Sequence, residues 1–187
     1  MAILLNGIVL FFGIHLFTST PLRSVAVSRV GDKAYKGIFS LLSLVGLGLI
    51  IWGFVQARSE PDAVSLVYNS PQWSAPITSV LVLVGLIMIA SSHGKGHIRK
   101  IVRQPMSVGI VLWAMGHLLS NGHTYEVILF GSFLAYAVFD IMLSTAKGKR
   151  PSYTPKVKAD IIAIVAGAVL FTLILFFHSS LFGASVI

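Results

Sequence analysis

The sequence predicts an all-α, polytopic transmembrane helix bundle with about six helices. Of its 187 residues, 56% are hydrophobic and only 11% are charged, and the mean hydropathy is +0.88. These values lie outside the range of a soluble domain of this size. The alternating segments of about ten residues that build a strand barrel do not appear. We therefore expect a single transmembrane helical domain over residues 1–187.

Six apolar segments can be drawn along the chain. They cover Ala2–Phe17, Ile38–Val55, Ile77–Ala90, Met106–Leu119, Tyr125–Leu143 and Asp160–His178. Several are shorter than the roughly 20 residues that a helix needs to cross a bilayer, so we expect these to extend into their polar flanks. The first helix is expected to continue to about Leu22.

The basic residues predict the orientation. All of them except Arg58 lie in the connections 18–37, 91–105 and 144–159, the last of which includes Lys149 and Arg150. These are alternate connections, so the positive-inside rule places them in the cytoplasm and both termini outside. The net charge of +8 is accordingly interpreted as a sign of topology, and no nucleic-acid partner is expected.

Several kinds of chemistry are excluded or disfavoured. Cysteine is absent, which rules out disulfides, thiolate nucleophiles and thiolate-ligated iron. Glu126, Asp140 and Asp160 lie near segment ends, so no acidic pair is expected at mid-membrane. The two halves of the chain have no convincing internal repeat. Both observations count against a haem-free transporter.

Four of the six histidines have simple explanations. His93 and His97 are four residues apart, a spacing used in metal sites, but the glycines and cations around them favour a solvated loop. His123 follows an Asn-Gly turn signal and is expected at the outer interface. His178 ends the last segment and can reach the interface.

His15 and His117 remain as the histidines expected inside the membrane. At 1.5 Å per residue, His15 lies about 10 Å and His117 about 18 Å from the basic face. An iron with one imidazole on each side separates the ligand Cα atoms by about 12 Å, which two packed helices can supply with this offset. A bis-histidine haem fits. The alternative is that each imidazole hydrogen-bonds a serine or a backbone carbonyl within the bundle.

Neighbouring residues are compatible with haem. Trp113 lies one helical turn before His117 and is expected beside a porphyrin edge. Arg23 and Arg103, at the basic face, are expected to pair with the propionates. Small residues recur along two segments, namely Ser40, Ser43 and Gly46, and Gly109 and Gly116. They either leave room for a macrocycle or allow plain helix packing.

An ordered set of motifs extends over nearly the whole chain. HLFTSTPLR, YKGIFSLLSLVGLGLIIWG, RQPMSVGIVLWAMGHLLSNG and FGSFLAYAVFD follow one another in this order. The set resembles the NnrU family of bacterial membrane proteins, named for a role in the expression of nitrite and nitric oxide reductases during denitrification. The family includes zeta-carotene isomerase, a membrane enzyme with b-type haem. The resemblance implies that His15 and His117 correspond to the haem-linked histidines of that enzyme.

Two positions depart from the family pattern. The usual Arg-His-Pro-Met is Arg103-Gln104-Pro105-Met106 here, and Ala114 stands where the isomerase has a cysteine implicated in ligand switching. Both differences weaken the transfer of the isomerase chemistry more than the transfer of haem binding.

The resemblance implies a function in the bacterial inner (cytoplasmic) membrane, with both termini periplasmic. We expect haem b (iron protoporphyrin IX) as cofactor, with the lipid bilayer as surroundings. The first expectation is a redox- or nitric-oxide-linked accessory or sensor protein associated with denitrification. The alternative is a haem-dependent cis-trans isomerase acting on a polyene such as zeta-carotene.

Overall fold

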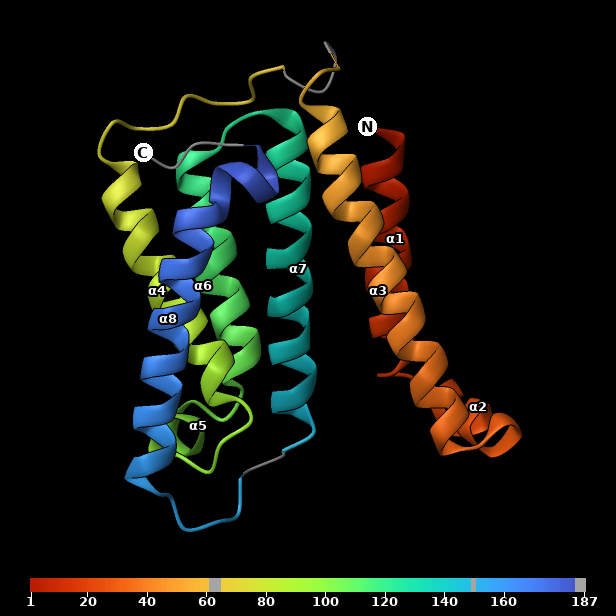
Figure 1. The fold of residues 1–187 in the computed structure, drawn as a ribbon. Helices are drawn as coiled ribbons and strands as arrows, with labels where there is room; N and C mark the ends of the chain where they lie inside the picture. The colour runs from red at the N-terminus through yellow and green to blue at the C-terminus, as the bar shows by residue number, and fades with distance from the viewer. Residues whose placement is uncertain (61–64, 149–150, 184–187) are drawn as a thin grey trace. The chain divides into compact units, whose positions relative to one another are not determined.

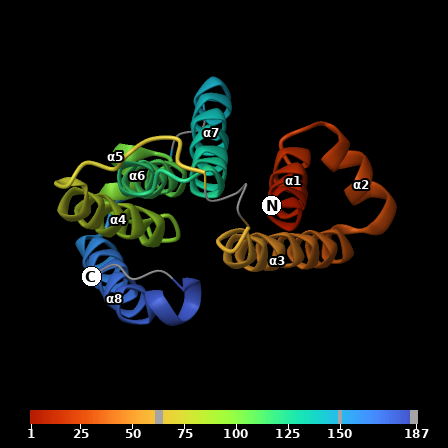
Figure 2. The same cartoon turned by 90° about the horizontal axis from the view of Figure 1, so that it is seen from above.

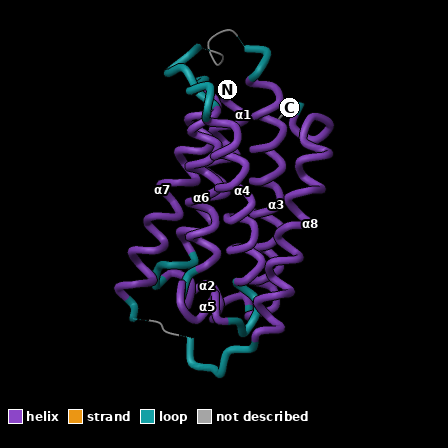
Figure 3. The backbone as a smooth tube through the Cα atoms, turned by 90° about the vertical axis from the view of Figure 1, so that its left-hand side faces the viewer, coloured by secondary structure: helices purple, strands orange, loops and turns teal. Residues whose placement is uncertain are grey.

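The computed structural model describes residues 1–60, 65–148 and 151–183. Within these ranges the chain is almost entirely helical, and strand-like pairing occurs only as one isolated bridge between Leu66 and His123 (Figure 3). The expected all-α architecture is therefore confirmed. Lys149 and Arg150, which entered the argument on topology, lie outside the described residues.

Six long helices and two short ones make up the described residues (Figure 1). They are α1 (Ala2–Phe17), α2 (Leu22–Val30), α3 (Asp32–Ala57), α4 (Ser74–Ser91), α5 (His97–Val102), α6 (Pro105–Ser120), α7 (Thr124–Ala146) and α8 (Val157–Phe182). The six long helices coincide with the six apolar segments of the sequence.

Four of these helices, α3, α4, α7 and α8, are long and apolar enough to cross a bilayer. The pair α1 and α2, bent by 87°, would count as a fifth span, and α6 is a shorter apolar helix of 16 residues. Sixteen residues rise about 24 Å, less than the roughly 30 Å of a hydrocarbon core. The expected extension into polar flanks holds for α3 and α8, with 26 residues each. It is wrong for α1.

The helix α1 ends at Phe17 rather than near Leu22 because the next residues satisfy its last carbonyls in another way. The Thr18 hydroxyl donates to the carbonyl of His15 at 2.7 Å, and the Thr20 hydroxyl donates to that of Phe17 at 2.8 Å. Such short polar side chains compete with the helical backbone, and Pro21 disfavours helical geometry at the residue before it.

The chain divides into two compact units, Met1–Ser65 and Leu66–Ile187. Each is described by itself below. The expectation of a single domain over residues 1–187 stays a prediction.

In the first unit, α1 packs antiparallel against α3, and α2 also packs on α3 (Figure 2). Glycines allow the close approach. A Cβ atom at Gly53 would lie 2.3 Å from the backbone nitrogen of Leu4, and one at Gly7 would lie 2.6 Å from that of Ile50. Gly46 likewise faces the backbone of α1. The contact surface of this helix pair therefore has no room for side chains at these positions.

In the second unit, α4 packs against α6 and α8, and α7 packs against α6 (Figures 1 and 2). A Cβ atom at Gly109 would lie 2.5 Å from the carbonyl oxygen of Gly85, and one at Gly167 would lie 2.6 Å from the Cα atom of Ile87. Of the two explanations for the recurring glycines, helix packing is therefore the one that the structure shows.

Hydroxyl groups reinforce the contact between α4 and α6. The Thr78 hydroxyl donates to the carbonyl of Gly116 at 2.7 Å and lies 2.6 Å from the Ser120 hydroxyl. Ser120 in turn donates to Ser74 at 3.0 Å. These bonds join the start of α4 to the end of α6, the part of α6 that carries His117.

The close contact between Gly85 and Gly109 yields a testable prediction. Gly109→Ala should lower the free energy of unfolding by about 1–3 kcal/mol, because the new methyl group would overlap backbone atoms of α4, which cannot move aside as a side chain can. Thermal unfolding of the purified protein in detergent measures the change. Gly131→Ala on α7 is the matched control, since its Cβ would meet no atom within 4 Å. An equal loss in both variants would contradict this account.

Candidate functional site

His15 lies in the last turn of α1 and is partly buried. Its Nδ1 donates to the carbonyl of Phe11 at 2.6 Å. The imidazole also lies against two aromatic rings, with centroid distances of 4.3 Å to Phe11 and 5.2 Å to Phe39 on α3. The histidine is thus held by its own helix on one side and by an aromatic side chain of α3 on the other.

His117 lies near the end of α6 in a closely similar setting. Its Nδ1 donates to the carbonyl of Trp113 at 2.9 Å. The ring centroid is 4.8 Å from that of Trp113, and the ring stacks on Phe130 of α7 at 4.4 Å. Trp113 in turn meets Phe130 and Phe133 edge to face at 5.2 and 5.3 Å.

The two units therefore contain the same local arrangement. In each, an aromatic residue precedes the histidine by four positions, accepts the Nδ1 hydrogen bond through its carbonyl and contacts the imidazole with its ring. A carbonyl can only accept, so Nδ1 carries the proton and Nε2 carries the lone pair. This is the tautomer in which a histidine binds iron through Nε2, with the second nitrogen oriented by the backbone.

The expectation that these imidazoles bond to backbone carbonyls is also met. It does not compete with ligation, because the carbonyl bond uses Nδ1 and leaves the ligating nitrogen to another partner. The two explanations that the sequence presented as alternatives are compatible in this geometry.

The position of His15 can be measured along α3, because α1 ends only two residues after it. His15 is level with Phe39, which lies seven residues after Asp32, the first residue of α3. Seven residues correspond to about 10 Å along α3, and the depth of His15 in the membrane stays a prediction. Within the second unit, His117 lies twelve residues after Pro105, or about 18 Å along α6.

The two arginines occupy different settings. Arg23 is exposed on α2, and its guanidinium lies 5.9 Å from the ring centroid of Tyr35. Arg103 ends α5 with a positive φ of 64° and is also exposed. It precedes the start of α6, whereas His117 lies near the other end of that helix. The structure thus brings Trp113 to His117 and leaves Arg103 apart from both.

The two departures from the family pattern lie on α6 and at its start. Ala114 is fully buried, so a methyl group fills the place where the isomerase has a thiol. Gln104 donates through Nε2 to the Thr145 hydroxyl at 3.2 Å. Its Oε1 is buried and has no hydrogen-bond partner among the described residues. Nearby, Ser107 donates to Asp140 at 2.6 Å, linking α6 to α7.

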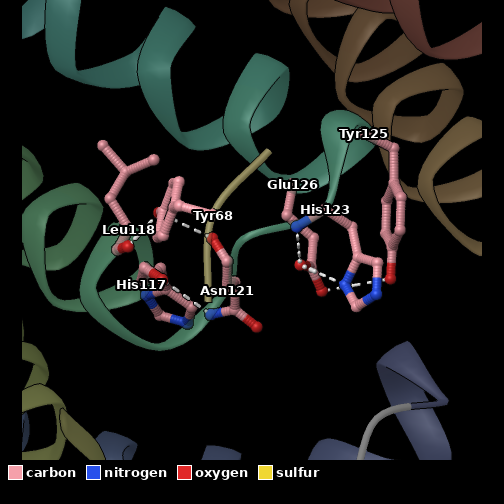
Figure 4. Close-up of polar contacts among 7 residues, drawn as sticks. All are labelled: Tyr68, His117, Leu118, Asn121, His123, Tyr125 and Glu126. Atoms are coloured by element: carbon pink, nitrogen blue, oxygen red, sulfur yellow. Dashed lines mark hydrogen bonds and ion pairs between the residues drawn. The ribbon is translucent and has the colours of Figure 1, made fainter. Parts of the chain in front are cut away.

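A tyrosine that the sequence did not single out holds the last turn of α6 (Figure 4). The Tyr68 hydroxyl bonds to the carbonyl of Leu118 and, at 2.8 Å, to that of Asn121. Asn121 donates through Nδ2 to the carbonyl of His117 at 2.8 Å. These partners lie 50 and 53 residues from Tyr68 in the chain, so no local sequence pattern could indicate them.

His123 and Glu126 form a capping box at the start of α7 (Figure 4). The backbone nitrogen of His123 donates to the Glu126 carboxylate at 3.0 Å, and its Nδ1 lies 3.1 Å from the same oxygen. The Tyr125 hydroxyl donates to the other oxygen at 3.0 Å. Glu126 is buried, and these three donors explain why it can be. His123 is thus the N-cap of α7, and the expectation that it lies at the outer interface stays a prediction.

His97 also has a structural partner. Its backbone nitrogen and its Nδ1 both bond to Asp160 on α8, at 2.9 and 2.8 Å. The described residues contain no group of three metal-binding side chains. His93 lies in an exposed loop, as expected, whereas His97 is the first residue of the short helix α5, which Asp160 caps.

A family comparison decides the relationship of the chain. The family model described as NnrU protein matches residues 3–186, nearly the whole length. The chain belongs to the NnrU family. A comparison with curated proteins and one with solved structures found no match. Membership of the NnrU family and the apolar helices together establish a membrane protein of this family.

The clamp formed by Tyr68 yields the second prediction. Tyr68→Phe should lower the free energy of unfolding by about 1 kcal/mol, because two carbonyls at the end of α6 lose their donor. Burial of the hydroxyl raises the pKa of Tyr68, and the negative charge of Glu126 raises it further. The raised pKa favours the neutral form in the folded state. The stabilisation by the Tyr68 hydroxyl should therefore be complete below the unfolded pKa of about 10. It should be lost as the pH rises through the pKa of Tyr68 in the folded protein.

Unfolding in detergent at pH 8 and above pH 10 measures both effects as the difference between the native protein and Tyr68→Phe. Tyr35→Phe is the matched control. The Tyr35 hydroxyl is buried without a hydrogen-bond partner among the described residues, so its removal should cost no stability. Equal losses in the two variants, or a Tyr68→Phe effect that does not change with pH, would contradict the assignment.

Proposed function

We propose that this NnrU-family protein binds haem b with His15 and His117 as axial ligands, and that it acts as a redox- or nitric-oxide-linked accessory or sensor protein. Bound haem would supply an iron that changes oxidation state and binds diatomic gases.

The repeated aromatic-histidine arrangement is the observation that supports this proposal. A histidine in an apolar helix is costly unless it has a function or a partner. In both places a backbone carbonyl accepts a hydrogen bond from Nδ1, and aromatic rings lie against the imidazole. Ligating histidines need both conditions, because the tautomer and the ring orientation set the direction of the Nε2 lone pair.

The residues around each histidine fit an apolar, flat cofactor. Phe39 lies beside His15, and Trp113 and Phe130 lie beside His117. Arg23 is the cation that we assign to a propionate, because α2 follows the helix of His15 after a short turn. The exposed guanidinium can exchange its contact with Tyr35 for a carboxylate, which is the stronger partner.

The two ligands would differ in how easily they move. His15 lies two residues before the end of α1, and the turn from Thr18 to Pro21 follows. The last turn of α6, in contrast, is tied by Asn121 and Tyr68, and Gly109 packs the helix against α4. Chain ends with few tertiary bonds open at lower free energy than packed helices. We therefore assign His15 as the imidazole that would give way to nitric oxide.

The visible spectrum of the detergent-purified protein tests the ligand assignment. The native protein should show a low-spin b-type haem. His15→Ala and His117→Ala should each give a high-spin spectrum or lose the haem, because one axial nitrogen is removed. His93→Ala is the control and should leave the spectrum unchanged, since His93 is exposed in the loop before α5. A native spectrum in His117→Ala, or no haem in the native protein, would refute the proposal.

A further prediction concerns the role of the protein. Carbon monoxide or nitric oxide added to the reduced protein should produce a gas-bound spectrum, and His15→Ala should bind the gas faster because no imidazole has to leave. Stopped-flow absorbance measures both rates. A cis-zeta-carotene offered to the same reduced protein should remain unchanged. Haem-dependent isomerisation that His15→Ala abolishes would overturn the accessory or sensor role in favour of an isomerase.

A further inference from the structure

The short helix α2 turns away from the direction of the helix before it. The axes of α1 and α2 differ by 87°, although only Thr18, Ser19, Thr20 and Pro21 separate the two helices. Since α1 runs antiparallel to the long helix α3, α2 lies across the direction of both. Its nine residues cannot span a bilayer in any orientation.

The contact between Arg23 and Tyr35 sets the level of α2 along α3. The guanidinium lies 5.9 Å from the centre of the Tyr35 ring, and Tyr35 is in the first turn of α3. The apolar run Ile38–Val55 begins about one turn later. All 26 residues of α3 rise about 39 Å, which exceeds the roughly 30 Å of hydrocarbon. The first turn of α3, and α2 with it, therefore falls at the level of the lipid headgroups.

The surface of α2 combines apolar and cationic side chains. Leu22, Val25 and Val30 are 57%, 48% and 48% exposed. Arg23 and Arg29 are also exposed. Leu22, Val25 and Arg29 share one face of α2, and Arg23 and Val30 share another. The aliphatic groups can therefore reach the edge of the hydrocarbon only if the long arginine side chains extend past them to the headgroups.

The charges in this region are not balanced within the protein. Residues 18–37 contain four basic residues and one acidic residue, a net charge of +3. The only acidic residue, Asp32, pairs with Lys36 at 2.6 Å. Arg23, Arg29 and Lys33 form no ion pair with any carboxylate of the described residues. Three exposed cations therefore lack an anionic partner.

We propose that the surface made by α2 and the first turn of α3 binds anionic phospholipid headgroups, with α2 lying in the plane of the membrane interface. The phosphates of these lipids are the partners of Arg29 and Lys33, while Arg23, which we assign to a haem propionate, adds to the positive charge of this surface. Neutral lipids supply the apolar contact but not the net negative charge, so the binding depends on anionic lipid and weakens with salt. The proposal does not depend on haem.

The native chain has no cysteine, which makes single-cysteine labelling clean. The full-length Val25→Cys protein, labelled with an environment-sensitive fluorophore, is reconstituted in vesicles of phosphatidylcholine alone or mixed with phosphatidylglycerol. The emission should shift to shorter wavelength when phosphatidylglycerol is present, and high salt should reverse the shift. The triple change Arg23→Gln, Arg29→Gln and Lys33→Gln in the same labelled protein should remove the response.

Two controls separate this effect from general charge and from label chemistry. Lys147→Gln, Lys156→Gln and Lys158→Gln remove the same number of exposed charges elsewhere and should leave the response of the Val25 label intact. A label on Ser152→Cys, in the exposed connection before α8, should report water in both kinds of vesicle. A Val25 label that reports water as Ser152 does, or a response that survives the loss of Arg23, Arg29 and Lys33, would overturn the proposal.

Discussion

Close backbone contact at glycines is the constraint on which the rest of the structure depends. Water drives no association between helices inside a bilayer, so van der Waals contact and polar bonds must hold them together. Gly7 and Gly53 in one unit, and Gly85 and Gly109 in the other, bring backbones into direct contact. Phe39 beside His15 belongs to α3, and Trp113 beside His117 belongs to α6. Both helices are held by these glycine contacts. A wider spacing would separate Phe39 from His15.

Most of the fold could be predicted because the membrane makes composition informative. The six apolar segments became the six long helices. The role of His123 as the N-cap of α7 was not predicted. The apolar segment Ala2–Phe17 has the same bounds as α1, but the expected extension to about Leu22 was wrong, because hydroxyl groups bond to the carbonyls of His15 and Phe17 where the helix ends. The helix α6 begins at Pro105, as the sequence indicated, and the depth of His117 in the membrane stays a prediction.

The candidate site was predictable to the extent that its chemistry is local. His117 and Trp113 lie one turn apart, so periodicity alone placed them together. The clamp by Tyr68 depends on a contact between residues 50 positions apart in sequence, and no local pattern announces it. Arg103 was selected for its closeness in sequence to α6, but closeness to the start of a helix means distance from a histidine near its end.

The central place of α4 in its unit has a consequence for how the protein is made. Both of its packing partners, α6 and α8, follow it in the chain, so α4 emerges from the ribosome before either exists. Three of its serine hydroxyls need no later helix as a partner, because Ser79, Ser91 and Ser92 donate to carbonyls of α4 itself. Gly85, in contrast, contacts the backbone of α6, which is synthesised later. The contacts that α4 makes with α6 and α8 can therefore form only after those later helices have been synthesised.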